Sequence, residues 1–385
     1  MHLALTDAQQ DLKDELRAYF AHLVEMVEAE GDEESTYLRY IRQMGSDGWL
    51  GIGWPTEYGG QGRGPIEQMV FVEESHWAGV PLPLLTLNSV GPTLMAVGTD
   101  EQKQRILPDI LRGEMHFAIG YTEPSAGTDL ASLKTKAVRD GDEYVINGQK
   151  IFTSAIQHAD YVWLATRTDP EAPNHKALSV FMMPVDTPGF RWTPLRTIAG
   201  DITSSTFYED VRVSVDNLVG AENQGWKIMT NQLNHERVAL CPASGLLRSL
   251  TDVRRWAQDH KLADGRKVID QEWVRVILAR VQAKVEVLKL FNWRVASAAA
   301  KGLKPADASA TKVYGTELAL EVYRQLMEVV GQAGYLAAGS AGAILQGRLE
   351  RQSRSQTIFT FGGGTNEVQR DIIAMVGLGM PRAPR

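Results

Sequence analysis

The spacing of apolar residues changes twice along the chain, and those two changes constrain the fold more than any other feature of the sequence. From Thr6 to about residue 115, apolar residues recur every three or four positions, which is the period of an amphipathic helix. Thr6 and Gln9 fit a capping box at the start of the first helix. The apolar stripe of that helix is Leu12, Leu16, Phe20 and Leu23. Further helices are expected at about 35–48, 66–79, 88–97 and 100–112.

Residues 116–222 have the composition of β-strands instead. Short runs rich in β-branched and aromatic residues follow one another, such as YVWLATRT and SSTFYEDVRV. Asp140-Gly141 and Asn147-Gly148 flank the run 143–146 and have the turn chemistry of consecutive hairpins. This third of the chain is therefore expected to form an antiparallel sheet or barrel.

The helical period returns at Gly225 and continues toward the end of the chain. After Trp273 one apolar stripe extends along a long helix, through Val274, Leu278, Val281, Val285, Leu288, Phe291 and Val295. The predicted fold class is α+β and mainly α. It comprises an N-terminal helical domain (1–115), a central antiparallel β domain (116–222) and a C-terminal four-helix bundle (223–385) that also meets another subunit.

Charge and cysteine content exclude several classes of protein. Lysine and arginine number 40 against 47 aspartates and glutamates, a net charge of −7, whereas a nucleic-acid binder normally has the opposite balance. Cys241 is the single cysteine, so an intrachain disulfide and a cysteine-rich metal cluster are both excluded, although an intermolecular disulfide stays possible. Neither a leader pattern nor an apolar run long enough to span a membrane is evident. We expect a cytoplasmic protein that binds neither nucleic acid nor membranes.

The common catalytic motifs are missing from the sequence. There is no GxxxxGK[ST] phosphate loop, and His235-Glu236 lacks a second histidine at Ala239, so no metal site is expected. The GGQGRG run at 59–64 has neither the glycine spacing nor the preceding strand of a dinucleotide fingerprint, which favours a glycine-rich turn.

The segment HFAIGYTEPSAGTD (116–129) differs because a strand-like run leads into a loop rich in amides and hydroxyls. The polar and small residues of this loop are Tyr121, Thr122, Glu123, Gly127, Thr128 and Asp129. Such a loop suits a ligand with polar edges. A capped turn without a ligand explains the same residues equally well.

Five segments in order, from residue 54 to residue 370, resemble the acyl-CoA dehydrogenase family. They are GWPTEYGGQGRG, TDEQKQRILPDILRGE, YTEPSAGTD, NGQKIFTSA and FGGGTNEVQR. The family's helical, β and four-helix domains match the three regions of the chain described above. The resemblance implies noncovalently bound FAD and the conversion of an acyl-CoA thioester to its trans-enoyl form.

The resemblance also implies roles for individual residues. Tyr121 and Thr122 would meet the pyrimidine side of the flavin, and Gly127 and Thr128 would line the ligand loop. Phe152, where many members have tryptophan, would stack on the flavin ring. Thr153 beside it would either pack on the ring or hydrogen-bond to it. The cofactor contacts implied in the C-terminal motif are Gly363, Thr365 and Glu367. Without the family, Phe152 would be interpreted as a core aromatic.

The catalytic base of many members lies in a YEGT motif, but the matching stretch here has Gly363 in place of the glutamate. The segment NQLNHERVAL resembles the branch, including isovaleryl-CoA and long-chain acyl-CoA dehydrogenases, whose base is a helical glutamate followed by arginine. Glu236 is therefore implied as the base, and Gly363 retains a backbone N–H for the thioester oxygen. Taken alone, a single helical glutamate is usually a solvated surface residue.

Two elements that bind the adenosine half of FAD in family homotetramers differ in this chain. The Arg-x-x-Phe-Gly loop is missing from WAQDHKLADGRKVIDQEW, and Glu328 and Gln332 replace a glutamine and a glycine of the second element. A carboxylate beside a pyrophosphate would repel it. The chain in this respect resembles the α subunits of actinobacterial α2β2 steroid acyl-CoA dehydrogenases, which act on the cholesterol side chain. This resemblance implies a steroid-CoA substrate in lipid degradation, a second dehydrogenase-like subunit and electron-transfer flavoprotein as acceptor.

Three alternatives stay open. The first is a non-catalytic scaffold that completes a partner's flavin site. The second is a branched-chain or long-chain acyl-CoA dehydrogenase, and the third is an acyl-CoA oxidase. The oxidase predicts rapid peroxide formation in air.

Overall fold

The computed structural model describes residues 3–29, 35–239, 241–299 and 302–382, without the side chains of 233–239. Its contacts divide the chain into two compact units. The helical unit comprises Met1–Glu30, Gly64–Pro81 and Arg237–Arg385, and the sheet unit comprises Gly31–Arg63 and Leu82–Glu236. Two segments of the first third of the chain thus pack with the C-terminal helices.

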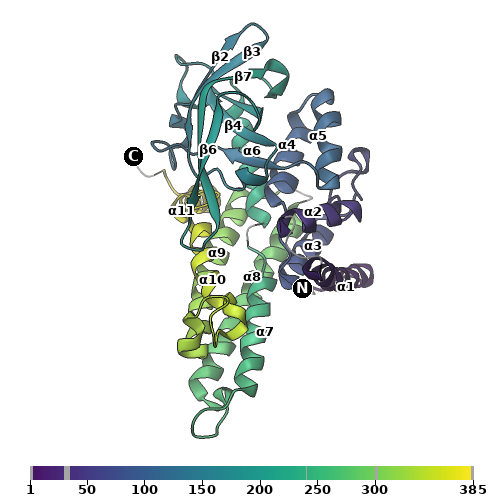
Figure 1. Cartoon of the computed structure of the whole chain (residues 1–385), viewed down its shortest axis with the longest axis vertical. Coiled ribbons are helices and arrows are strands. Elements are labelled where there is room, and N and C mark those ends of the chain that lie inside the picture. Colours follow the sequence, from purple (N-terminus) through teal and green to yellow (C-terminus); the bar gives the residue numbers. More distant parts are fainter. Residues whose placement is uncertain (1–2, 30–34, 240, 300–301, 383–385) are drawn as a thin grey trace. The chain divides into compact units, whose positions relative to one another are not determined.

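The helical unit contains the long helices α8 and α9 and several shorter ones (Figure 1). Its helices are α1 (Asp7–Ala29), α3 (Pro65–Ala78), α7 (Ser244–Asp259), α8 (Glu272–Ala299), α9 (Pro305–Val330), α10 (Arg348–Ser355) and α11 (Asn366–Ile372). Helix α3 contacts α1, α7 and α8. The predicted capping box at the start of α1 is confirmed, because Gln9 N donates to Thr6 Oγ1 at 3.3 Å and Thr6 N donates to Gln9 Oε1 at 3.0 Å.

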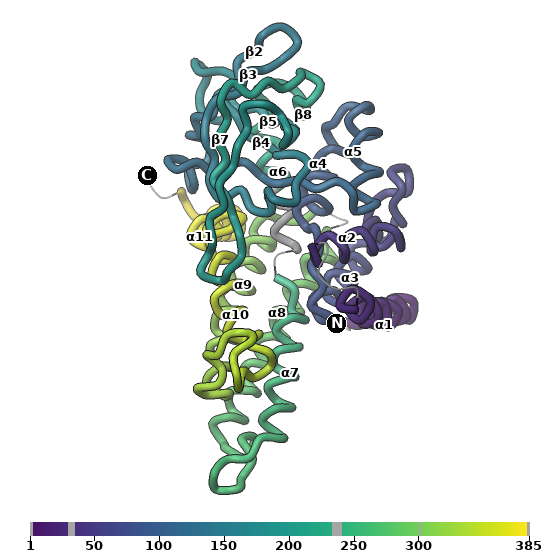
Figure 2. The backbone as a smooth tube through the Cα atoms, viewed as in Figure 1, coloured from purple at the N-terminus to yellow at the C-terminus, as the bar shows by residue number. Residues whose placement is uncertain are grey.

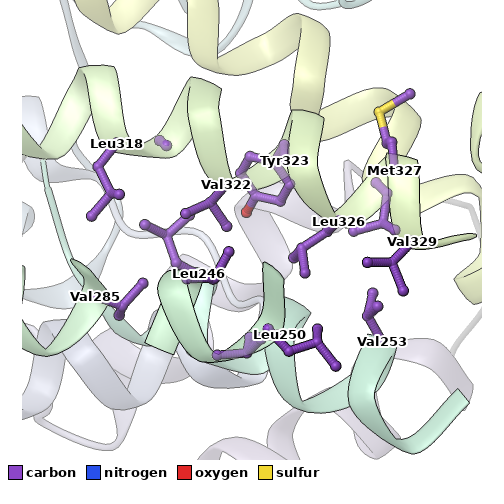
Figure 3. Close-up of a cluster of buried hydrophobic side chains, with 14 of the residues drawn as sticks. Leu246, Leu250, Val253, Val285, Leu318, Val322, Tyr323, Leu326, Met327 and Val329 are labelled. Carbon is purple, nitrogen blue, oxygen red and sulfur yellow. The ribbon is translucent and has the colours of Figure 1, made fainter. Parts of the chain in front are cut away.

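The core of the helical unit lies between α7, α8 and α9. Leu246, Leu250 and Val253 of α7 face apolar side chains of α9 (Figure 3). The predicted stripe of α8 is buried, except that Phe291 is only partly buried. Burial of such a stripe supplies about 25 cal/mol for each Å² of apolar surface removed from water, which is the main stabilising contribution to a helix bundle.

The sheet unit surrounds an eight-stranded sheet with short helices. Its helices are α2 (Thr36–Ser46), the π-helical turn Thr86–Val90, α4 (Gly91–Val97), α5 (Asp100–Arg112) and α6 (Gly225–Ala239), which crosses the boundary between the units. Its strands are β1 (Phe117–Gly120), β2 (Lys136–Asp140), β3 (Glu143–Lys150), β4 (Tyr161–Arg167), β5 (Leu178–Pro184), β6 (Phe190–Arg196), β7 (Ile202–Ser214) and β8 (Leu218–Val219). In Figures 1 and 2 the long strand β7 lies beside β3, its hydrogen-bonded partner.

The sheet is mixed, whereas the sequence predicted an antiparallel sheet or barrel. The order is β6-β7-β3-β2-β4-β5-β8, and β1 pairs with β4 outside this path. Strand β1 is parallel to β4 from Phe117↔Tyr161 onward, and β2 is parallel to β4 at Lys136↔Arg167. Parallel pairing requires a long connection between strands, and composition carries no signal for it.

The two predicted turns have different outcomes. Asp140-Gly141 does form the β2–β3 hairpin, with Gly141 at φ +64°. The turn predicted at Asn147-Gly148 is wrong, because β3 continues through it and the pairing with β7 shifts there as a bulge. A Cβ on Gly148 would lie 2.4 Å from Thr135 Oγ1, so this glycine permits close approach of two backbones.

Candidate functional site

The loop after β1 is closed on itself. Glu123 and Ala126 exchange both backbone hydrogen bonds, at 3.0 and 3.1 Å, so the chain reverses direction directly after the strand. Gly127 and Thr128 then lie exposed, and a Cβ built on Gly127 would meet a single described heavy atom within 4 Å, Thr122 Cγ2. At Gly127 and Thr128 the loop therefore presents an open surface.

A buried ion pair holds this loop against β3. Lys150 Nζ lies 2.9 Å from Glu123 Oε1 and donates to Tyr121 O at 3.1 Å, and both charged side chains are almost completely buried. The same carboxylate accepts from the backbone amides of Lys134 and Thr135, at 2.7 and 2.8 Å. Burial lowers the pKa of Lys150 to about 8. Burial alone would raise the pKa of Glu123, but Lys150 and the Thr135 donor lower it overall.

The Tyr121 side chain points into the interior of the sheet unit. Its hydroxyl donates to Gln232 Oε1, and Trp163 Nε1 donates to both groups, at 3.0 Å to Tyr121 and 2.9 Å to Gln232. Gln232 belongs to α6, so this network joins that helix to the sheet. Gln232 Nε2 is buried without a hydrogen-bond partner in the described part of the chain.

Residues 150–154 lie directly beside the loop, since Ile151 N donates to Thr122 O at 2.8 Å. Phe152 has φ +61° and its side chain is 61% exposed, which leaves a flat aromatic face uncovered within the sheet unit. Thr153 is fully buried, with its hydroxyl 3.3 Å from Thr206 Oγ1. The next hydroxyl belongs to the exposed Ser154 and donates to Thr203 Oγ1 at 3.0 Å. The sheet unit thus brings together four of the implied cofactor residues: Tyr121, Thr122, Phe152 and Thr153.

The C-terminal motif lies in the helical unit. Gly363 and Gly364 have φ values of +67° and +91°, and Thr365 caps α11 by accepting from Val368 N at 3.3 Å. Glu367 is exposed in the first turn of α11. Hydrogen bonds from its own backbone and from Thr365 lower the pKa of Glu367.

Position 236 lies in α6, one helical turn after Gln232. The Glu236 side chain itself is outside the described residues. Positions 232 and 236 occupy the same face of a regular helix, so the network at Gln232 fixes the rotation of the helix that carries the predicted base.

Several residues of this arrangement were missed from the sequence. Lys150, Trp163 and Gln232 join the loop, the strands and α6, but no role was assigned to any of the three from the sequence. The only signal was that they lie within the segments NGQKIFTSA, YVWLATRT and NQLNHERVAL. Among the described residues, no group of three or more His, Cys, Asp or Glu side chains is arranged to hold a metal ion. Nor does any helix of the described ranges combine the length and apolarity needed to cross a bilayer.

Family models match nearly the whole chain. The N-terminal, middle and C-terminal domains of acyl-CoA dehydrogenases match residues 6–114, 118–211 and 223–378. The chain therefore belongs to the acyl-CoA dehydrogenase family, and it is an oxidoreductase with the predicted fold class.

Individual relatives cover the full length of the chain. Acyl-CoA dehydrogenase FadE26 of Mycobacterium tuberculosis is 56% identical over 400 residues, with 100% of both chains covered. The ChsE4-ChsE5 complex from the same organism contains a chain with 57% identity, a TM-score of 0.94 and complete coverage of both chains. A chain of the Tcur3481-Tcur3483 steroid acyl-CoA dehydrogenase is 50% identical, with a TM-score of 0.93 and complete coverage of both chains.

Members of this family are FAD flavoproteins, and the residues of the sheet unit fit such a group. The exposed Phe152 ring provides an apolar face, and the open turn at Gly127 admits close approach of a polar edge. Ser204 Oγ is fully buried without a hydrogen-bond partner in the described part of the chain, next to the Thr203 hydroxyl that bonds Ser154.

Proposed function

We propose that this acyl-CoA dehydrogenase oxidises the side-chain CoA thioester of a steroid during cholesterol or sterol degradation, as the α subunit of an α2β2 heterotetramer. The observation that carries the proposal is the end-to-end similarity to a chain of a complex described as a steroid acyl-CoA dehydrogenase. The proposal includes a cytoplasmic location, because a single cysteine is typical of a reducing compartment. Electron-transfer flavoprotein is the proposed acceptor.

The proposed FAD site uses two groups of residues. Those of the sheet unit are Tyr121, Thr122, Gly127, Thr128, Phe152 and Thr153, and those of the helical unit are Gly363, Thr365 and Glu367. Bound FAD would supply the acceptor for the hydride that leaves the β carbon. Tyr121 contributes through its main chain, since its hydroxyl is engaged with Gln232 and Trp163. The buried Thr153 packs against Thr206 of β7, while the exposed ring of Phe152 would contact the flavin.

Glu236 is the proposed acceptor of the α proton. A carboxylate acts as such a base when a water-poor pocket raises its pKa toward the working pH. Glycine at position 363 is consistent with this role, because a second carboxylate would repel the first and disturb its pKa. The Gly363 N–H would hold the thioester oxygen as negative charge develops on it.

A partner subunit would complete the adenosine half of the site. Glu328 at the end of α9 and Gln332 just beyond it are both exposed, so neither change serves the core of this chain. A carboxylate and a longer side chain at these two positions disfavour a pyrophosphate. The proposed partner is a second acyl-CoA dehydrogenase-like chain that retains the Arg-x-x-Phe-Gly loop.

The test uses the chain co-expressed with its partner. Flavin bleaching is followed with a steroid-CoA thioester and with straight-chain and branched-chain acyl-CoA substrates, which separates the steroid enzyme from the alternative dehydrogenases. Glu236→Gln should lower the bleaching rate by ~10²–10⁴-fold, the usual contribution of a general base. Glu272→Gln, an exposed glutamate at the start of α8, is the matched control. Full activity of Glu236→Gln would eliminate Glu236 as the base.

The second candidate is a scaffold subunit that completes the partner's flavin site, and the changes at Glu328 and Gln332 favour it. In that case, mutating only the partner's catalytic glutamate would abolish all flavin reduction. Persistent reduction in that variant would exclude the scaffold. Rapid peroxide formation in air would instead identify an acyl-CoA oxidase.

A further inference from the structure

Lys312 is fully buried in α9, beneath the C-terminal glycine loop. Its Nζ donates to Gly364 O at 2.9 Å, to Thr360 O at 3.1 Å and to Asn366 Oδ1 at 2.7 Å. A buried ammonium is costly unless hydrogen bonds replace its water shell. These three oxygens do so, and two of them are main-chain carbonyls on either side of Gly363.

A second group of contacts limits the same loop. Gln369 is fully buried, and its Oε1 accepts from Ser309 Oγ of α9 at 2.8 Å. A Cβ on Gly364, where φ is +91°, would lie 2.7 Å from Gln369 Nε2. The loop is thus bound to α9 through two of its carbonyls, and at Gly364 it packs so closely against Gln369 of α11 that there is no room for a side chain.

We propose that Lys312 is a positioning residue: it holds loop 360–366 so that the Gly363 N–H has the orientation needed for the thioester oxygen. This inference rests on the proposed role of Gly363. Removing the ammonium leaves the carbonyls of Thr360 and Gly364 without their buried donor, and both would turn toward water. The peptide units next to Gly363 would turn with them.

The experiment compares Lys312→Met with Lys284→Met in the assembled complex. Methionine keeps an unbranched chain without a donor, and Lys284 is a half-exposed lysine that pairs with Glu321, so its loss tests charge removal alone. Amide hydrogen exchange in peptides covering 360–366 should accelerate by at least ~10-fold in Lys312→Met only, since three hydrogen bonds are lost. With acyl-CoA, kcat should fall by at least ~10-fold while KM changes by less than ~3-fold, because the oxyanion donor acts mainly in the transition state.

Gly364→Ala provides an independent perturbation of the same loop, which is useful if Lys312→Met does not fold. The added methyl would clash with Gln369 Nε2, and the positive φ of residue 364 is unfavourable for alanine. The same pattern of faster exchange and lower kcat is therefore expected. Unchanged exchange in Lys312→Met would overturn the proposal, as would faster exchange in either variant with kcat at the wild-type value. If the wild-type complex oxidises no acyl-CoA, the proposed function fails, whereas the exchange result still tests the link between Lys312 and the loop.

Discussion

The buried pair of Lys150 and Glu123 should contribute strongly to the stability of the sheet unit. Replacing Lys150 with methionine keeps an unbranched side chain but removes the ammonium that contacts Glu123 Oε1 at 2.9 Å and Tyr121 O at 3.1 Å. The Glu123 carboxylate would then remain almost fully buried without its countercharge.

The magnitude follows from what remains around the carboxylate. Removal of one partner of a buried ion pair costs ~3–5 kcal/mol, because the other charge is left uncompensated. Two backbone donors, at 2.7 and 2.8 Å, still solvate Glu123 and place the loss at the lower end, at ~3 kcal/mol. Loss of the hydrogen bond from Lys150 to the Tyr121 carbonyl adds ~1 kcal/mol.

The assay is denaturant unfolding of the assembled protein, together with amide exchange in peptides covering 121–135. Lys150→Met should lower the free energy of unfolding and accelerate exchange in this loop. The double variant Glu123→Gln/Lys150→Met should recover part of the loss, because it removes the isolated charge. Arg212→Met is the control, since its ion pairs with Asp140 and Glu143 are exposed to solvent, which screens them.

Two results would refute a strong contribution from this ion pair. The first is a loss of stability in Lys150→Met no larger than that in Arg212→Met. The second is a double variant less stable than Lys150→Met alone. Either outcome would mean that the carboxylate is adequately compensated by its backbone donors.

Two further predictions concern packing and pH. Burial lowers the pKa of His76 to about 4 from its ordinary 6.5, so between these pH values the unfolded chain binds more protons than the folded one. The free energy of unfolding should therefore fall as the pH drops through this window, by at most ~3 kcal/mol, and His76→Gln should flatten the dependence measured by urea titrations. Gly91→Ala should destabilise by ~1–3 kcal/mol, because its methyl would lie 2.2 Å from the buried Trp54 ring. Gly245→Ala, near the start of α7 with no described atom within 4 Å of the added methyl, should instead stabilise by ~0.5 kcal/mol, and thermal melts of both variants measure the two effects. Equal effects of the two alanines would contradict the steric explanation for Gly91.

Helices were predictable because the spacing of apolar residues within each one shows which face is buried. The helix expected at 100–112 corresponds to α5 (Asp100–Arg112), and the stripe after Trp273 is the buried side of α8. Strand pairing was predicted less well. Asn147-Gly148 has the composition of a turn, but Thr135 from the segment before β2 lies so close that glycine is needed there for space.

For the implied cofactor residues, too, the sequence indicated the positions and the structure defines the environment of each side chain. Resemblance located Phe152 and Thr153 on neighbouring positions, but only the structure distinguishes an exposed ring from a fully buried hydroxyl. The base proposed at Glu236 and the contacts proposed at Gly363, Thr365 and Glu367 stay predictions, and the experiments above address Glu236 and the loop that contains Gly363.

From its residue order alone, this chain reveals its helices, its β region, its family and the exchange of a loop carboxylate for glycine, because these are local patterns. Lys150 and Lys312 have the sequence context of ordinary solvated lysines, yet the folded chain buries both and surrounds them with oxygen atoms. Their acceptors lie between 27 and 54 residues away along the chain. Such burial arises only when distant segments pack together, and for that reason tertiary structure alone decides which charges hold the loops of the site.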